Sequence, residues 1–208
     1  MSDIIIRKAH KSDIPYFYEI CLKTGDAGKN AEDLYFDPYL IGNYYAAPYF
    51  FFPEGICFVA EYQCRPQGYI IAAPDTAAFE KWMEEQWLPP LRRQYHQPFP
   101  QELIRSEKEA ELIKTIHNKK FPLEKYYENL YKDYPAHLHI DMLPTLQGKG
   151  LGRKLMNTLF MELERQGIKS LHLGVSAENK NAVLFYQKLD FSVFKEHSWG
   201  FTLVKQLG

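Results

Sequence analysis

The clearest hydrophobic pattern in this chain is the alternation of polar and apolar residues over 137–142, which is typical of a β-strand with one face on a core. Two apolar runs, 56–62 and 68–73, flank a short turn-rich stretch and predict a β-hairpin. Further short strands are predicted over residues 4–7, 171–175, 191–194 and 199–204. The pattern therefore predicts a sheet built from segments at both ends of the chain.

Helical spacing of apolar residues predicts the helices that connect these strands. A first helix follows Ser12 and Asp13, which resemble a cap, and ends at about Thr24. A leucine stripe predicts a helix that begins at about residue 151, and another helix is predicted over 179–189. Because a helix separates the strands at 137–142 and 171–175, we expect these two strands to lie parallel.

Residues 77–136 have a different character, with amphipathic helices separated by prolines. No linker rich in Gly or Ser sets this block apart. We therefore predict one domain over residues 1–208 with a helical insertion at about 77–136. Its charge-rich stretch 106–114 is interpreted as the solvated face of a helix.

Charge and composition narrow the function classes. The chain has 25 Lys and Arg residues against 26 Asp and Glu residues, so its net charge of −1 offers no broad attraction to nucleic acid or to an anionic membrane. Its apolar runs are too short to span a membrane, and its N-terminus lacks a signal-peptide pattern. Its three cysteines lack the spacing of a redox or zinc pair. We expect a cytoplasmic protein with no nucleic-acid or membrane partner.

Residues 147–152, which read Gln-Gly-Lys-Gly-Leu-Gly, form a glycine-rich turn between a predicted strand and a predicted helix. Such a turn exposes backbone N–H groups at the positive end of the helix dipole, where a pyrophosphate can bind. The glycines fit neither the Walker A pattern nor the G-x-G-x-x-G pattern of dinucleotide-binding proteins. The pattern that fits is Q-x-x-G-x-G.

This turn follows a strand that ends in Met142-Leu143-Pro144, and the whole stretch resembles the acyl-CoA-binding motif of the GNAT superfamily of N-acetyltransferases. A downstream run is similar to the next motif of that superfamily; it contains Val175, Asn179, Ala182, Tyr186, Leu189 and Phe191. The two motifs together cover about 137–196. The resemblance implies an α/β fold with a mixed, mostly antiparallel sheet whose parallel central strands splay apart, flanked by helices. Asp190 stands where the superfamily usually has glycine.

The predicted insertion supports a narrower resemblance. Its aromatic and proline pattern is similar to the acetyltransferase-like C-terminal domain of animal O-GlcNAcases and their bacterial relatives. The pattern is carried by Phe79, Trp82, Trp87, Pro89, Arg92 and Tyr95, and it continues through Phe121-Pro122 to Ile140-Asp141-Met142. The animal domains have a degenerate glycine turn, whereas this chain keeps its glycines. The comparison therefore favours an active protein.

The resemblance implies a transferase that moves an acetyl group from acetyl-CoA to a primary amine by direct attack in a ternary complex. The acceptor would be a small molecule or a peptide or protein amine, and a homodimer is compatible with the family. Residues implied to bind acetyl-CoA are Met142, Leu143, Gln147, Gly148, Lys149, Gly150, Leu151, Gly152, Arg153, Asn179 and Tyr186. The Met142 N–H would stabilise the oxyanion and Tyr186 would protonate the leaving thiolate.

Asp141 is the candidate general base, because it lies next to Met142 on the polar face of its strand. A structural aspartate and a chain of waters are the alternatives for this role.

Parts of the sequence are also compatible with two rival functions. The pattern His137-x-His139-x-Asp141 resembles a zinc motif of metallo-β-lactamase-fold hydrolases, yet position 142 is Met and the other histidines do not group, so we expect no metal. The second rival is a non-catalytic module that binds acyl-CoA or another protein. The intact glycines and Tyr186 argue against it.

Overall fold

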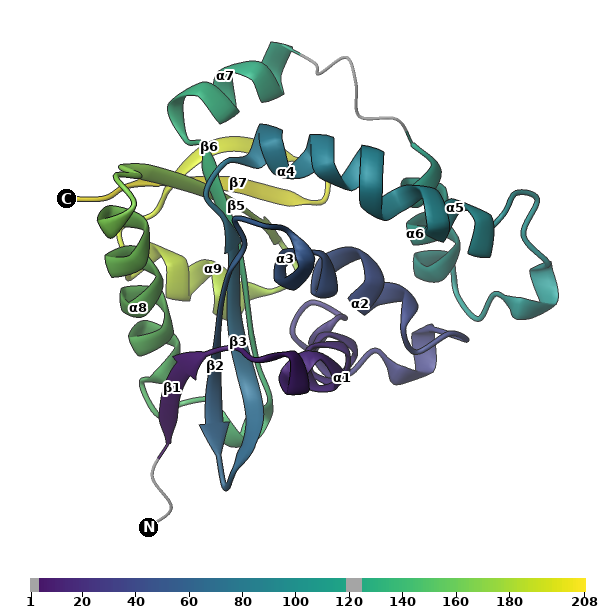
Figure 1. The fold of residues 1–208 in the computed structure, drawn as a ribbon, viewed down its shortest axis with the longest axis horizontal. Coiled ribbons are helices and arrows are strands. Elements are labelled where there is room, and N and C mark those ends of the chain that lie inside the picture. The colour runs from purple at the N-terminus through teal and green to yellow at the C-terminus, as the bar shows by residue number, and fades with distance from the viewer. Residues whose placement is uncertain (1–3, 119–124) are drawn as a thin grey trace.

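The computed structural model describes residues 4–118 and 125–208 (Figure 1). Within these residues a seven-stranded sheet has the order β1-β2-β3-β4-β5-β7-β6. Its strands are β1 Ile5–Lys8, β2 Ile56–Tyr62, β3 Arg65–Ala73, β4 Ala136–Met142, β5 Ser170–Ser176, β6 Ser192–His197 and β7 Gly200–Gln206. Neighbouring strands are antiparallel except β4 and β5, which are parallel. The predicted fold class is confirmed.

The helices of the described ranges are α1 Ile14–Thr24, α2 Leu40–Tyr45, α3 Ala47–Phe51, α4 Thr76–Trp82, α5 Leu88–Gln94, α6 Glu107–His117, α7 Lys125–Asp133, α8 Leu151–Arg165 and α9 Lys180–Gln187. A π-helical turn, Met83–Trp87, joins α4 to α5. α2 and α3 are separate helices, because Ala46 leaves the helical conformation and Pro48 lies in the first turn of α3. No helix of the described residues is both long enough and apolar enough to cross a membrane.

Side chains that alternate along the strands supply two cores, one on each face of the sheet. Tyr69 and Ile71 of β3 face the helices α1 to α6, whereas Ile70 faces α8 and α9. Figure 1 shows α8 on one side of the sheet and α1 to α3 on the other. The leucine stripe of α8 is fully buried against its face, as predicted; it consists of Leu151, Leu155, Leu159 and Leu163. These layers hold the end of β4 between two sets of helices.

The insertion is helical, as predicted, although residues 119–124 of it lie outside the described residues. The interpretation of 106–114 as a solvated face is wrong at Glu109, which is 1% exposed. Its carboxylate accepts backbone N–H groups from Phe36, Asp37 and Arg105. The buried carboxylate therefore ties α6 to the segment before α2.

The parallel strands β4 and β5 separate soon after they meet. Their register contains only Ala136 opposite Leu171 and His137 opposite His172. Beyond these pairs, residues 138–142 of β4 and 173–176 of β5 have no partner across the gap among the described residues. The predicted splay of the central strands is confirmed, and it opens the sheet next to the glycine-rich turn.

Candidate active site

A cavity of about 720 Å³, called the outer cavity below, lies where β4 ends. Its walls are the 147–152 turn, the start of α9 and the loop residues 27–29. The predicted site residues that line it are Asp141, Met142, Gln147, Gly148, Gly150, Leu151, Gly152, Arg153, Asn179 and Tyr186. Two motifs that are separated in sequence thus form one cavity.

The glycines of the turn serve two different purposes. Gly148 and Gly150 both have a φ of 73°, and a Cβ added to either would meet no atom within 4 Å. They therefore give the turn its left-handed conformation and leave open space in front of it. At Gly152 a Cβ would lie 3.1 Å from the Phe185 ring and 3.2 Å from the Met142 side chain, so this glycine lets α8 pack closely.

Cations surround the outer cavity. Lys29, Lys180 and Lys188 line it together with Arg153, against one acidic residue, Glu178, apart from Asp141. Such a surplus of positive charge suits an anionic ligand. The sequence motifs did not reveal the three lysines, since their positions depend on how the loop after α1 and both ends of α9 pack around the cavity.

Two predicted cofactor residues lie outside this lining. The Leu143 N–H donates to the carbonyl of Gln67 at 2.8 Å, and its side chain packs on the core next to α1. The Lys149 ammonium donates to the Thr145 carbonyl at 2.7 Å, so its side chain turns back along the chain. The contacts of these two residues with acetyl-CoA therefore remain predictions. At Lys149 the predicted contact would be made by the backbone.

Gln147 fixes the turn to the strand. Its Nε2 donates to the Met142 carbonyl at 2.9 Å. Successive N–H groups of a strand point to opposite edges, and the Leu143 N–H points toward β3, so the Met142 N–H points into the gap between β4 and β5. A backbone donor in this position can stabilise negative charge on a ligand atom.

Tyr69 holds the Asp141 carboxylate from the neighbouring strand. The two residues lie opposite each other in the β3–β4 register, and the Tyr69 hydroxyl donates to Asp141 Oδ2 at 2.7 Å. Burial raises the pKa of Asp141, while hydrogen bonds from Tyr69 and Thr24 act in the opposite direction. The result is a half-buried carboxylate with a raised pKa, as a general base requires.

Asp141 also lines a second cavity, of about 510 Å³, called the middle cavity. It lies in the gap itself, against Gly174–Ser176 of β5, and shares Tyr186 with the outer cavity. Tyr186 is 7% exposed, and burial followed by the charge of Asp141 raises its pKa well above the usual value. Its hydroxyl therefore stays protonated at neutral pH and faces the junction of two cavities.

Asn179 has a structural task as well as a place in the lining. Its Oδ1 accepts the Ala182 N–H at 3.1 Å and caps α9. Its Nδ2 lies 3.0 Å from where a Cβ on Gly28 would be. The loop after α1 therefore needs glycine there to approach Asn179, and Nδ2 remains near the cavity for a ligand carbonyl.

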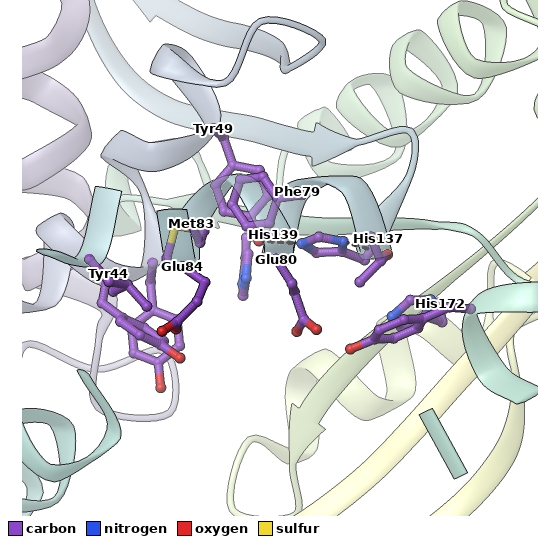
Figure 2. A pocket seen from close by; sticks show the side chains of 13 residues that line it. Tyr44, Tyr49, Phe79, Glu80, Met83, Glu84, His137, His139 and His172 are labelled. Atoms are coloured by element: carbon purple, nitrogen blue, oxygen red, sulfur yellow. Dashed lines mark hydrogen bonds between the residues drawn. The ribbon is translucent and has the colours of Figure 1, made fainter. Parts of the chain in front are cut away.

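The geometry of His137 argues against the zinc-hydrolase alternative. Its Nε2 lies 2.6 Å from the Tyr49 hydroxyl and its Nδ1 lies 2.7 Å from the Thr76 hydroxyl (Figure 2). Since Thr76 donates its own proton to the Pro135 carbonyl, Nδ1 donates to Thr76 and Nε2 accepts from Tyr49. Both nitrogens are engaged. Within the described ranges, no three His, Cys, Asp or Glu side chains are arranged to hold a metal ion.

Comparison with known proteins covers most of the chain. The family model described as the acetyltransferase (GNAT) family matches residues 26–191. The crystal structure of SsHAT superposes with a TM-score of 0.83 at 28% identity, over 98% of this chain and 98% of its own. A PaiA N-acetyltransferase from Thermoplasma acidophilum in complex with coenzyme A superposes with a TM-score of 0.56 at 14% identity, over 98% of this chain and 99% of its own. The second likeness shows the fold.

A curated relative matches over a short segment. The ribosomal protein bS18-alanine N-acetyltransferase of Escherichia coli strain K12 is 43% identical over 49 residues, which are 24% of this chain. The match spans about a third, 33%, of that relative's length.

Proposed function

Because the chain belongs to the acetyltransferase (GNAT) family, we propose that it transfers an acetyl group from acetyl-CoA to a primary amine by direct attack in a ternary complex. The observation that carries this proposal is the junction of the outer and middle cavities at Asp141 and Tyr186. Asp141 and Tyr186, the proposed base and acid, line both cavities at this junction, and we assign one cavity to each substrate.

The outer cavity suits acetyl-CoA. Its open glycine turn and its lysines fit the diphosphate and the further phosphate of an acyl-CoA, whose acetyl group would supply the electrophile. The backbone of 147–152 would hold the diphosphate, with Lys29 and Lys180 near the remaining phosphate. Asn179 and the Met142 backbone would hold the pantetheine arm in the gap between β4 and β5.

The chemistry follows from the side chains at the junction. Asp141 would take a proton from the acceptor ammonium, directly or through a water, so that the nitrogen can bond to the acetyl carbon. The Met142 N–H would stabilise the charge on the carbonyl oxygen. As the carbon–sulfur bond breaks, Tyr186 would give its proton to the thiolate.

Two measurements test the proposal. Calorimetry should show acetyl-CoA binding, and a panel of primary amines should show acetyl-CoA-dependent release of coenzyme A with formation of the N-acetyl product. Failure to bind acetyl-CoA would contradict the proposal outright. Binding without acetylation of any amine in the panel would favour the non-catalytic acyl-CoA-binding module instead.

The expected cytoplasmic location and homodimer also remain proposals. The three cysteines, Cys21, Cys57 and Cys64, are free thiols, which is compatible with a reducing compartment. Light scattering of the purified protein would test the dimer.

A further inference from the structure

A third cavity, the inner pocket, lies beyond the middle cavity and has a volume of about 170 Å³ (Figure 2). It shares Tyr45 and His139 with the middle cavity. An engineered apolar cavity of about 150 Å³ holds benzene, so this pocket has room for a group of roughly six heavy atoms. The three cavities therefore lie next to one another in a series that ends in a small compartment.

One face of β4 runs along this series. His137 lines the inner pocket, His139 lines the inner pocket and the middle cavity, and Asp141 lines the middle and outer cavities. Residues two apart in a strand share a face and lie roughly 7 Å apart. The inner pocket therefore lies roughly 7–13 Å from the proposed reaction centre at Asp141.

Aromatic rings form much of the wall of the inner pocket. Tyr49 stacks on Phe79 with ring centroids 4.5 Å apart, and Tyr44 meets Tyr45 edge to face at 4.8 Å. Such ring faces attract a cation as well as an alkyl chain. The wall is thus suited to an organic ammonium or guanidinium group.

Glu80 supplies negative charge inside this aromatic wall. It is 8% exposed, and Figure 2 shows its carboxylate pointing into the space that the labelled side chains enclose. Burial, followed by the charge of Glu80, raises the pKa of Tyr131, which also lines the pocket. A second carboxylate of the lining, Glu84, accepts two hydrogen bonds from Arg92, at 2.6 and 2.7 Å. Glu80, which also accepts a hydrogen bond from Tyr131, is the carboxylate that points into the pocket and can meet a cationic ligand there.

His172, which also lines the inner pocket, adds no positive charge at neutral pH. His172 Nδ1 donates to the Tyr134 carbonyl at 2.7 Å, and burial lowers the His172 pKa to about 4. The described lining contains no Lys or Arg side chain. The electrostatic character of the pocket is thus acidic and aromatic.

We propose that the inner pocket binds the distal cationic end of the acceptor, and that the acceptor is an aliphatic diamine whose second amine reaches Glu80. This inference rests on the acetyl transfer proposed above. One amine would lie at Asp141 while the other end passes His139. The distance along β4 requires roughly 7–13 Å between the two nitrogens, so short diamines cannot span it.

A chain-length series tests the proposal. Linear diamines with two to ten carbons and the matching linear monoamines are assayed with acetyl-CoA. The long diamines should exceed monoamines of equal length in kcat/KM by roughly 10- to 100-fold, as expected for a hydrogen bond to a charged group. The advantage should vanish for the diamine with two carbons. Equal kcat/KM for long diamines and monoamines would overturn the proposal.

A matched pair of variants assigns the effect to the pocket. Glu80→Gln should lower kcat/KM for the best diamine to the level of its monoamine. Glu85→Gln removes the same charge from an exposed neighbour outside the lining and should keep the preference for diamines. Equal preference in Glu80→Gln and wild type would overturn the assignment. If Glu80→Gln does not fold, the wild-type series still decides.

Direct binding separates this inference from the proposed reaction. Calorimetry with the best diamine, in the absence of acetyl-CoA, should give weaker binding for Glu80→Gln than for Glu85→Gln. If that difference is found while no amine is acetylated, the pocket stands and the proposed reaction fails. If monoamines are acetylated and no diamine binds more tightly than its monoamine, the reaction stands and the diamine inference fails.

Discussion

The hydroxyl of Tyr69 and the carboxylate of Asp141 are joined across the β3–β4 pair by a hydrogen bond of 2.7 Å. Tyr69 is completely buried, so this bond is sheltered from water. It stabilises the ionised form of Asp141 against the effect of burial. We therefore expect Tyr69 to position the proposed base and to lower its pKa against the effect of burial.

Tyr69→Phe should move the acid limb of the kcat/KM profile to higher pH. The hydrogen bond from Tyr69 favours the ionised form of Asp141, so the loss of this bond raises the Asp141 pKa further. A hydrogen bond to a charged group is worth about 1.5–3 kcal/mol, which corresponds to roughly one to two pH units. Tyr39→Phe, at an exposed tyrosine, is the control. An acid limb that stays in place would show that Tyr69 does not tune the base.

Asp141→Asn should lower kcat/KM most at neutral pH and recover partly as the pH approaches the amine pKa of about 10.4, because free amine then needs no base. Thermal stability should not fall at pH 7. Since the folded-state pKa of Asp141 is raised, the ionised carboxylate lowers the stability of the folded state as pH rises through that pKa, and Asn removes this cost. Equal loss of activity at every pH, or a lower melting temperature, would make Asp141 structural.

Tyr186→Phe should lower kcat by roughly 10²- to 10⁴-fold while the affinity for acetyl-CoA changes little. The substitution keeps the ring that packs on Phe191 and removes only the hydroxyl proton. Single-turnover kinetics measures the rate of acetyl transfer, and calorimetry measures the affinity for acetyl-CoA. Tyr16→Phe, outside the described cavity linings, is the control. A change confined to KM would make Tyr186 a binding residue rather than the acid.

Gly150→Glu should abolish acetyl-CoA binding, since a carboxylate would project into the outer cavity. Gly167→Glu is a closely matched control: its φ is 79° against 73° for Gly150, and a Cβ at either meets no atom within 4 Å. Both variants should lose about 1–2 kcal/mol of stability from the left-handed conformation. Calorimetry and thermal melting check this. Equal affinity for acetyl-CoA in the two variants would show that the diphosphate does not bind at the 147–152 turn.

Local patterns were sufficient to predict the second half of the fold. The strand at 137–142, the glycine turn and the helix at 151 are consecutive in sequence, so periodicity and turn chemistry define them. Asp190, which departs from the superfamily pattern, keeps the expected turn with a φ of 61°. Asp tolerates this conformation better than most residues, which explains why the turn keeps its conformation without a glycine.

Features that depend on long-range packing could not be predicted in this way. Tyr69 reaches Asp141 only through the register of two strands that are 72 positions apart. Glu80 lines the inner pocket only because α4 packs over β4, where Thr76 and Phe79 contact His137. The hairpin turn also differed from expectation: Gln63 and Cys64 both adopt positive φ, so β3 begins at Arg65 without the Asn or Gly that signals such a turn.

The brief pairing of β4 with β5 has a consequence for how the protein responds to its substrate. The sheet consists of two well-paired halves, and the seam between them has only two residue pairs in register. Backbone groups that face the seam, such as the Met142 N–H, must bond to solvent until a ligand strand fills the gap. We therefore expect acetyl-CoA to slow deuterium uptake along this seam and to raise the melting temperature with its concentration. The substrate would then act as a temporary eighth strand of the scaffold.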